Sequence, residues 1–303
     1  MNKTIYPPNL NSGDKAIIIS PSGNIDFQYI NGACQVLQNW GLVVEIATHA
    51  EGQYGRFGGT VDQRITDLQQ AMDDPDVRLI FCSRGGYGIV HLLDKLNFEG
   101  IKKYPKWIVG YSDITALHLA LLQDGIVSLH APMARHLTED SLDIASSYLK
   151  DCLFMDMPEY SLDSHSLNRE GLVRGKLFGG NLAVLSGLIG TPYMVVIPEN
   201  GILFIEDIGE APYKIDRMMW QLKLSGILSH ISALIVGQFT DCREDPLMGS
   251  TIYESIRDIV KDYNYPLVFN FPVGHVKENY SLLHGATVAL EVSENNVKMK
   301  NSR

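Results

Sequence analysis

Ser112 stands at a junction between a predicted strand and a predicted helix, where a serine hydroxyl could act as a nucleophile. The apolar residues Trp107–Val109 lead through Gly110 and Tyr111 to this serine, and residues 113–123 carry apolar side chains at the spacing of one helical face. At such a turn the hydroxyl is held clear of the sheet, beside the N–H groups of the first helical turn, which have no partner within the helix. Attack on a carbonyl and stabilisation of the resulting anion could therefore occur in one place. Alternatively, the serine caps the helix, and the turn lacks the second glycine of the usual hydrolase elbow.

A serine nucleophile needs a base, and three of the nine histidines are placed to be considered. His275 follows an apolar segment that stops at a proline and a glycine, so we expect it on a loop. His130 ends a predicted strand and competes for the role of base. His118 lies on the helix after Ser112, and we expect it to pack locally. His275 is the preferred base, and the alternative is a loop histidine whose hydrogen bonds go to the backbone.

The base in turn needs an acid to orient it, and two adjacent carboxylates, Glu206 and Asp207, end a strongly apolar segment. A carboxylate that directly follows buried residues is costly unless it is paired or hydrogen-bonded. A histidine N–H would satisfy that need and fix the tautomer of the ring. The alternatives are that one of these carboxylates caps the next segment, or pairs with Lys214 or Arg217.

The glycine-rich segment Ser83–Gly88 resembles a phosphate-binding loop at first sight. It lacks the Lys-Ser/Thr of a P-loop, and its spacing is not that of the dinucleotide fingerprint. Consecutive glycines after a strand do allow backbone N–H groups to approach an anion closely. The segment therefore favours an oxyanion donor or a site for a substrate carboxylate over nucleotide binding. Arg84 could attract that carboxylate, or it could form a structural ion pair.

Composition excludes several classes of partner. The net charge is −10 and no Lys/Arg cluster offsets it, which argues against a nucleic acid or an anionic membrane as partner. The four cysteines are scattered without metal-ligand or redox spacing, so we expect buried free thiols in a reducing compartment and neither a metal nor a cofactor. The sequence shows no signal peptide and no apolar stretch of membrane-spanning length, which predicts a cytoplasmic protein.

The first half of the chain alternates between strand and helix signals. Such alternation implies right-handed crossovers and a parallel sheet covered on both faces, with ligands bound beyond the carboxyl ends of the strands. We predict a doubly wound, flavodoxin-like α/β domain over residues 1–155. Its expected strands are 16–20, 42–47, 78–82, 107–109 and 126–129, and its expected helices are 25–40, the segment from the Thr60 cap through Met72, about 89–96, 113–123 and 142–154.

The second half differs in character, and we predict a smaller mixed α/β domain over residues 171–303. Residues 156–170 are polar without a clear period and are interpreted as the linker between the two domains. Gly179–Asn181 is expected to be a turn. The expected strands are 171–178, 202–205, 233–239 and 286–292, and the expected helices are 182–189, 213–224 and 251–263.

Taken together, these segments resemble the LD-carboxypeptidase family of serine peptidases, which also includes microcin-immunity-type peptidases. The motifs appear in the family's order and span roughly residues 13–290. The matching stretches are Gly55-Arg56-Phe57 with Gly59 and Arg64, Arg84-Gly85-Gly86-Tyr87-Gly88, Gly110-Tyr111-Ser112-Asp113, Gly179-Gly180-Asn181-Leu182, Glu206-Asp207 followed by Pro212-Tyr213 and Ile215-Asp216-Arg217, and Gly274-His275 with Asn279.

The resemblance implies a catalytic triad of Ser112, Glu206 and His275. In that arrangement the serine attacks the scissile carbonyl, the histidine carries the proton and the glutamate orients the histidine. The N–H groups of Gly86 and Asp113 would form the oxyanion hole. The resemblance further implies an active site at the interface of the two domains and a homodimer. Further candidates for substrate binding are Arg84, Gly85, Tyr87 and Asn181.

The activity implied by the resemblance is removal of the terminal D-alanine from muropeptide tetrapeptides during cell-wall recycling. The immunity-type branch instead hydrolyses an aminoacyl-nucleotide amide, and it carries an extra loop with an aromatic residue that stacks on the base. A chain of 303 residues leaves no obvious room for that loop, which favours the carboxypeptidase branch. The third hypothesis is a non-catalytic module that binds a peptide.

Overall fold

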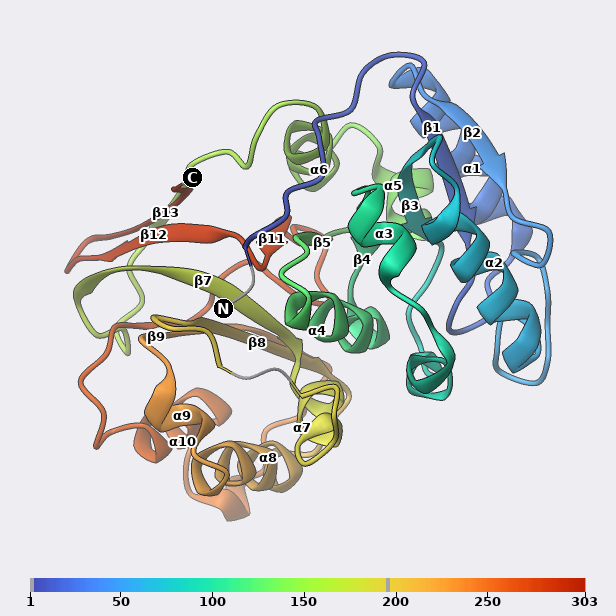
Figure 1. Ribbon diagram of the computed structural model, residues 1–303. Coiled ribbons are helices and arrows are strands. Elements are labelled where there is room, and N and C mark those ends of the chain that lie inside the picture. Colours follow the sequence, from blue (N-terminus) through green and yellow to red (C-terminus); the bar gives the residue numbers. More distant parts are fainter. Residues whose placement is uncertain (1–2, 195–196, 303) are drawn as a thin grey trace. The chain divides into compact units, whose positions relative to one another are not determined.

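The computed structural model of this chain describes residues 3–194 and 197–302, which form two compact units (Figure 1). The chain up to Met157, together with Tyr280–Gly285, forms the first unit. Pro158–Asn279, together with the chain from Ala286 on, forms the second. Within the segment 156–170, interpreted above as a linker, strand β6 (Tyr160–Asp163) pairs with β13 (Asn296–Asn301) in the sheet of the second unit.

The first unit contains a sheet with the strand order β11-β5-β4-β3-β1-β2. Strands β1 to β5 are parallel and follow the order 2-1-3-4-5 of flavodoxin-like folds, so the predicted fold class is confirmed. The three-residue strand β11 adds an antiparallel edge. The strands are β1 (Lys15–Ile19), β2 (Val43–Ile46), β3 (Val77–Cys82), β4 (Trp107–Gly110), β5 (Ser128–His130) and β11 (Leu282–His284).

Some helices of the first unit start at side-chain caps that the sequence provides. Thr60 and Gln63 form a capping box at α2, as predicted from Thr60, and Asp26 caps α1. Helix α1 packs against α5, and α2 packs against α3. The helices are α1 (Phe27–Asn39), α2 (Val61–Asp73), α3 (Glu99–Lys103), α4 (Thr115–Gln123), α5 (Ala134–Asp140) and α6 (Ile144–Phe154).

Two helix predictions in the first unit were wrong in detail. The helix expected over residues 89–96 consists of two short 3₁₀ turns, Ile89–His91 and Leu93–Lys95. The helix after Ser112 was expected to expose one face, but α4 is buried from Thr115 through Leu122. Beyond the predicted apolar face, Ala116, Leu119 and Ala120 place small or apolar side chains on the remaining faces, so the whole helix can be buried.

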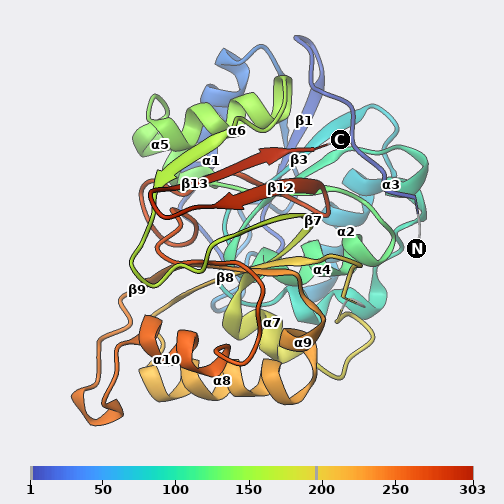
Figure 2. The same cartoon turned by 90° about the vertical axis from the view of Figure 1, so that its left-hand side faces the viewer.

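The second unit contains a mixed sheet with the order β10-β9-β8-β7-β12-β13-β6. Strands β7 to β10 are parallel, and β12, β13 and β6 continue the sheet in antiparallel fashion. The helices α7 to α10 lie on one face of the β7–β9 part of this sheet (Figures 1 and 2). The elements are β6 (Tyr160–Asp163), β7 (Gly171–Asn181), α7 (Leu182–Leu188), β8 (Ile202–Ile208), α8 (Pro212–Leu224), α9 (Ile227–His230), β9 (Ala233–Thr240), α10 (Ile252–Ile259), β10 (Leu267–Val268), β12 (Thr287–Val292) and β13 (Asn296–Asn301).

The turn predicted at Gly179–Asn181 is instead the last part of strand β7. A side chain at Gly179 would place its Cβ 1.9 Å from the carbonyl oxygen of Phe204 on the neighbouring strand. The glycine is therefore required by the close approach of two strands, and no reversal of the chain occurs there.

Two observations concern the composition. All four cysteines are free thiols; Cys34, Cys82 and Cys152 are buried as predicted, whereas Cys242 is only partly buried. Among the helices of residues 3–194 and 197–302, none combines the length and the apolar character that crossing a membrane requires.

Candidate active site

The Ser112 turn connects β4 to α4 through a 3₁₀ turn, Ser112–Ile114. Ser112 has a φ of 65°, a left-handed backbone conformation that costs a residue with a side chain about 1–2 kcal/mol. Strain of this kind is typical of a serine at a nucleophile elbow, where it presents the hydroxyl above the sheet. Ser112 begins this turn and Tyr111 stands at the cap position without a side-chain bond, so the capping interpretation is wrong.

Gly85 lies directly against this turn. A Cβ at Gly85 would be 2.8 Å from Cβ and 3.1 Å from Oγ of Ser112, so only glycine leaves the serine its position. The neighbouring Gly86 has a φ of +108°. The N–H groups of Gly86 and Asp113 donate to no protein acceptor within the described residues. The glycine-rich loop and the serine turn are thus adjacent, and both offer donors to an anion.

The side chain of Asp113 has a role that the sequence reasoning missed. The carboxylate is 2% exposed and accepts hydrogen bonds from the Ser22 hydroxyl at 2.5 Å and from the Ile89 N–H at 2.9 Å. These bonds tie the Ser112 turn to the loop after β1 and to the segment after Gly88. Because its side chain accepts hydrogen bonds from two different segments, Asp113 is a structural anchor as well as a candidate backbone donor.

Glu206 and His275 are brought together in the second unit. His275 Nδ1 lies 2.7 Å from Glu206 Oε2, and the glutamate is fully buried on β8. An ionised carboxylate only accepts, so Nδ1 carries the hydrogen and Nε2 is left as the basic nitrogen of the ring. The histidine side chain is 15% exposed. The pairing with Lys214 or Arg217 considered above is wrong, because Lys214 pairs with Glu210 and Arg217 stacks on Tyr213.

The loop that carries His275 is held by two neighbours. Gly274, with a φ of +122°, donates its N–H to Oδ1 of the buried Asn279 at 2.9 Å. A Cβ at Gly274 would lie 2.8 Å from Cβ and from Oε2 of Glu206. The Gly-His sequence signals this arrangement, because a glycine in the left-handed region leaves room for the carboxylate.

Asp207, the second carboxylate, serves the local structure. It accepts hydrogen bonds from Nδ2 of Asn181, from the N–H of Ala183 at the start of α7, and from its neighbour Ile208. Burial raises the pKa of Asp207 to about 6. Asn181, a predicted substrate-binding residue, is buried and also caps α7 through a bond from the Val184 N–H.

The other two histidines lie inside the first unit. His118 is buried between the hydroxyl of Ser128 and the carbonyl oxygen of Gly110, at 2.8 Å from each, and burial lowers its pKa to about 4. This confirms the prediction that it packs locally. His130 is also fully buried on β5, and its ring lies 5.6 Å from the ring of Tyr111.

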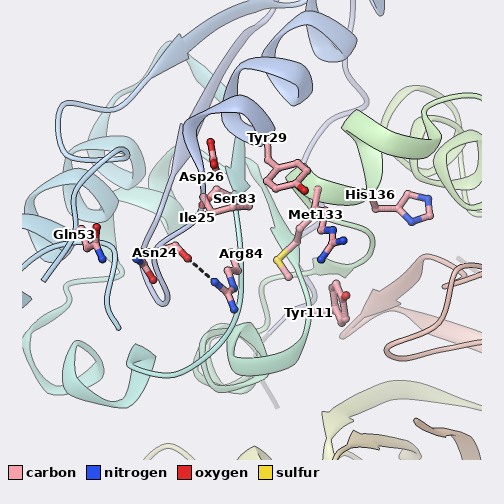
Figure 3. Close-up of a pocket in the computed structure, with 11 residues that line it drawn as sticks. Asn24, Ile25, Asp26, Tyr29, Gln53, Ser83, Arg84, Tyr111, Met133 and His136 are labelled. Carbon is pink, nitrogen blue, oxygen red and sulfur yellow. Dashed lines mark hydrogen bonds between the residues drawn. The ribbon is translucent and has the colours of Figure 1, made fainter. Parts of the chain in front are cut away.

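A pocket of about 540 Å³ lies beside the Ser112 turn (Figure 3). Arg84 lies in it between Asn24 on one side and Met133 and Tyr111 on the other. The Arg84 Nη1 donates to the Asn24 carbonyl at 2.6 Å, so the structural ion pair considered for this arginine does not form within the described residues. Tyr87 lies outside this pocket, is 45% exposed and packs its ring on those of Phe57 and His91.

One group of side chains within the described residues has the spacing of a metal site. Ligand atoms of His136, Asp140 and Asp143 lie within 4.8 Å of one another. His136 Nε2 is already 3.1 Å from Asp143 Oδ1, and the same carboxylate caps α6. The group is therefore explained by local structure.

The comparison with known sequences decides the family. Residues 17–131 match the LD-carboxypeptidase N-terminal domain, and residues 174–290 match the LD-carboxypeptidase C-terminal domain. The chain belongs to the LD-carboxypeptidase family. The resemblance found from the motifs is confirmed, and the protein is a serine carboxypeptidase.

Several LD-carboxypeptidases are similar over nearly the whole chain. A probable murein peptide carboxypeptidase of Bacillus subtilis is 33% identical and covers 95% of this chain and 92% of its own. The murein tetrapeptide carboxypeptidase of Pseudomonas aeruginosa is 31% identical, with 91% and 93% covered. The crystal structure of muramoyltetrapeptide carboxypeptidase from Oxalobacter formigenes is 31% identical, has a TM-score of 0.86 and covers 95% of this chain and 99% of its own. The Escherichia coli microcin C7 self-immunity protein MccF is more distant, at 26% identity, with 80% and 79% covered.

Proposed function

We propose that this protein is a serine LD-carboxypeptidase that removes the terminal D-alanine from muropeptide tetrapeptides, with Ser112, Glu206 and His275 as its catalytic triad. The observation that carries the proposal is the 2.7 Å contact between His275 Nδ1 and the buried Glu206 Oε2. A buried carboxylate that fixes one ring nitrogen of a partly exposed histidine leaves the other nitrogen as a proton acceptor. The similarity to murein peptide carboxypeptidases favours a peptide with a terminal D-alanine as the substrate.

The reaction proceeds in two halves. Ser112 Oγ bonds to the carbonyl carbon of the residue before D-alanine while its proton passes to His275 Nε2. The C–N bond then breaks, and the imidazolium gives this proton to the departing amine, which releases D-alanine. A water molecule repeats the sequence on the acyl-enzyme, and the histidine returns the proton to the serine. Glu206 stabilises the imidazolium in both halves.

The N–H groups of Gly86 and Asp113 stabilise the oxyanion in this scheme. Each N–H is a donor fixed by the backbone, so it needs no reorganisation when charge develops on the carbonyl oxygen. Loss of one such donor costs on the order of 3 kcal/mol in the transition state. The anchoring bonds of the Asp113 side chain contribute indirectly, because they hold the turn that presents the second donor.

The test is incubation of the purified protein with monomeric tetrapeptide, with tripeptide and free D-alanine measured by mass spectrometry. We expect Ser112→Ala, Glu206→Gln and His275→Ala to lower turnover by several orders of magnitude. Wild-type turnover in Ser112→Ala would remove the proposed nucleophile. Matched controls on exposed positions are Ser147→Ala, Glu139→Gln and His230→Ala, which should retain activity.

A double variant tests whether the residues act as a unit. Triad members contribute non-additively, so Ser112→Ala combined with His275→Ala should be little slower than either single variant. Additive losses would show that the two residues act independently.

The second candidate is hydrolysis of an aminoacyl-nucleotide amide, which the similarity to MccF favours. The same triad would perform that reaction, so the choice depends on substrate alone. Turnover of the tetrapeptide should exceed that of a nucleotide-amide analogue under our proposal. Family membership favours either reaction over a non-catalytic peptide-binding module.

We further propose that the protein acts in cytoplasmic recycling of cell-wall peptides as a homodimer. The four free cysteines support a reducing compartment. Fractionation of the source cells and light scattering of the purified protein test the location and the dimer.

A further inference from the structure

A small pocket of about 220 Å³ in the first unit combines two arginines with the oxyanion donor proposed above. Its walls come from the loops after β1, β2 and β3. Strands β1 and β3 are neighbours, and the strand order of the sheet reverses between them. Ligands of open α/β sheets bind at this position, outside the carboxyl ends of the strands. The lining residues are Gly23, Asn24, Arg56, Arg84, Gly86 and Tyr87.

Neither arginine of this pocket has an acidic partner among the described residues. Arg84 Nη1 donates to the Asn24 carbonyl oxygen. The side chain of Arg56 makes no hydrogen bond or ion pair with any residue that the structure describes. The protein has 35 acidic residues against 25 lysines and arginines, so the two arginines do not lack acidic partners because the chain has few carboxylates. A guanidinium carries five N–H donors and stays protonated, and its fork matches a carboxylate. Both arginines are therefore charged, and both have N–H groups left to donate to a ligand.

Arg84 also borders the larger pocket of about 540 Å³ shown in Figure 3. The other arginine that lines that pocket, Arg135, already donates Nε to Glu139 and stacks on the ring of Tyr29. Arg84 therefore stands between the two cavities, and only the smaller one contains Gly86. The unpaired positive charge is concentrated where the scissile carbonyl would bind.

The covalent structure of the substrate limits the distance between its scissile carbonyl and its terminal carboxylate. In a C-terminal dipeptide unit the terminal carboxylate carbon follows the scissile carbonyl carbon after one nitrogen and one Cα, a span of about 4 Å or less. A group that binds this carboxylate must lie close to the donor that binds the scissile oxygen. Arg84 is two residues from Gly86 and shares its pocket.

We propose that Arg56 and Arg84 bind a carboxylate of the peptide substrate in the pocket that they share with Gly86. This inference rests on the proposed function. The terminal carboxylate of the leaving residue lies within this short distance of the scissile carbonyl. The side-chain carboxylate of a diaminopimelate at the third position offers the same chemistry, and the experiment separates the two sources.

The experiment measures binding by calorimetry in the inactive Ser112→Ala variant, so turnover does not enter. The probes are the diaminopimelate tetrapeptide, its C-terminal amide, and the tetrapeptide with lysine at the third position. A charge-assisted pair is worth a factor of about 10–100 in affinity, so the acid should bind that much more tightly than the amide. Arg84→Gln and Arg56→Gln, each added to Ser112→Ala, should abolish this preference, and Arg84→Lys should retain part of it.

The matched control is Arg78→Gln. Arg78 also donates to one backbone carbonyl, that of Pro75, but it lies near the amino end of β3, away from the pocket. This variant should keep the preference. Thermal unfolding of each variant checks the fold. If Arg84→Gln does not fold, the acid-over-amide preference is measured in Arg84→Lys instead.

Each outcome decides the question. Loss of the acid-over-amide preference assigns the terminal carboxylate, and loss of a diaminopimelate-over-lysine preference assigns the side-chain carboxylate. Preferences that survive in both arginine variants, or no peptide binding at all, would overturn the inference. If Ser112→Ala binds peptide as expected but the wild-type protein releases no D-alanine, the proposed function fails and the carboxylate site stands.

Discussion

Gly274 and Glu206 are in such close contact that a methyl carbon on the glycine would lie 2.8 Å from the carboxylate oxygen Oε2. The same oxygen is 2.7 Å from His275 Nδ1. The residue before the histidine must therefore lack a side chain for the buried carboxylate to reach the ring. The φ of +122° at Gly274 adds a second reason for glycine.

We predict that Gly274→Ala lowers turnover at least tenfold and lowers the free energy of unfolding by about 2–3 kcal/mol, the cost of overpacking with backbone strain. The matched control is Gly209→Ala, where φ is +72° but no atom lies within 4 Å of the new Cβ. That variant carries backbone strain alone, so it should lose stability while retaining turnover. Activity assays and chemical denaturation measure both quantities, and equal turnover in the two variants would contradict the prediction.

Gly85→Ala tests the corresponding contact at the serine. The added carbon would meet Cβ of Ser112 at 2.8 Å and the carbonyl oxygen of Tyr111 at 3.0 Å, so the turn must shift. A shift of the Ser112 hydroxyl away from its reacting position is expected to lower turnover by about 100-fold. Gly187→Ala, at a position on α7 with no atom within 4 Å, should leave turnover unchanged. A Gly85→Ala enzyme of normal activity would mean that the serine position is not critical.

The doubly wound parallel sheet of the first unit followed from the sequence because alternating strands and helices restrict a parallel sheet to few arrangements. Strand β11 did not, since three residues carry no periodicity and their partner β5 is more than 150 positions away. The glycines of β7 were misassigned as a turn because glycine serves both chain reversal and close strand approach. Only the position of Phe204 on the neighbouring strand distinguishes these uses.

The chemistry of the site was predictable where the residue type itself carries it. A serine after a strand and a histidine on a loop are visible as patterns, and the family motifs supplied the pairing with Glu206. The anchoring role of the Asp113 side chain was not visible, because its partners Ser22 and Ile89 lie 91 and 24 positions away. Such contacts are fixed by tertiary packing, which local patterns do not record.

The backbone strain at Ser112 predicts an unusual order of stability between two inactive variants. Ser112→Gly relieves the left-handed conformation, whereas Ser112→Ala keeps it, so the glycine variant should be more stable by about 1 kcal/mol despite the entropy of glycine in the unfolded chain. At the exposed helix position Ser147 the order should reverse, since glycine is about 1 kcal/mol worse than alanine in a helix. Thermal unfolding of the four variants gives the comparison. The same order at both positions would show that Ser112 is not strained.

Asp207 predicts a pH dependence of stability whose sign is opposite to that of a salt-bridged carboxylate. Burial raises the pKa of Asp207 from an ordinary 3.8 to about 6 in the folded protein. Below pH 3.8 the group is protonated in both the folded and the unfolded state and carries no penalty. Between about pH 4 and 6 the unfolded chain releases the proton while the folded protein retains it, so the free energy of unfolding falls as the pH rises. Above about pH 6 both states are ionised and the loss is complete.

Asp207→Asn removes this titration and therefore isolates it from the other ionisable groups. The stability of the wild type relative to Asp207→Asn should fall by on the order of 3 kcal/mol between pH 4 and pH 7. The asparagine cannot accept all three hydrogen bonds from Asn181, Ala183 and Ile208, so it will be less stable than the wild type at low pH. Only the change of that difference with pH reports the carboxyl, and chemical denaturation across the range measures it. The exposed Asp94→Asn control should run parallel to the wild type, and a parallel curve for Asp207→Asn would mean that burial does not hold its proton.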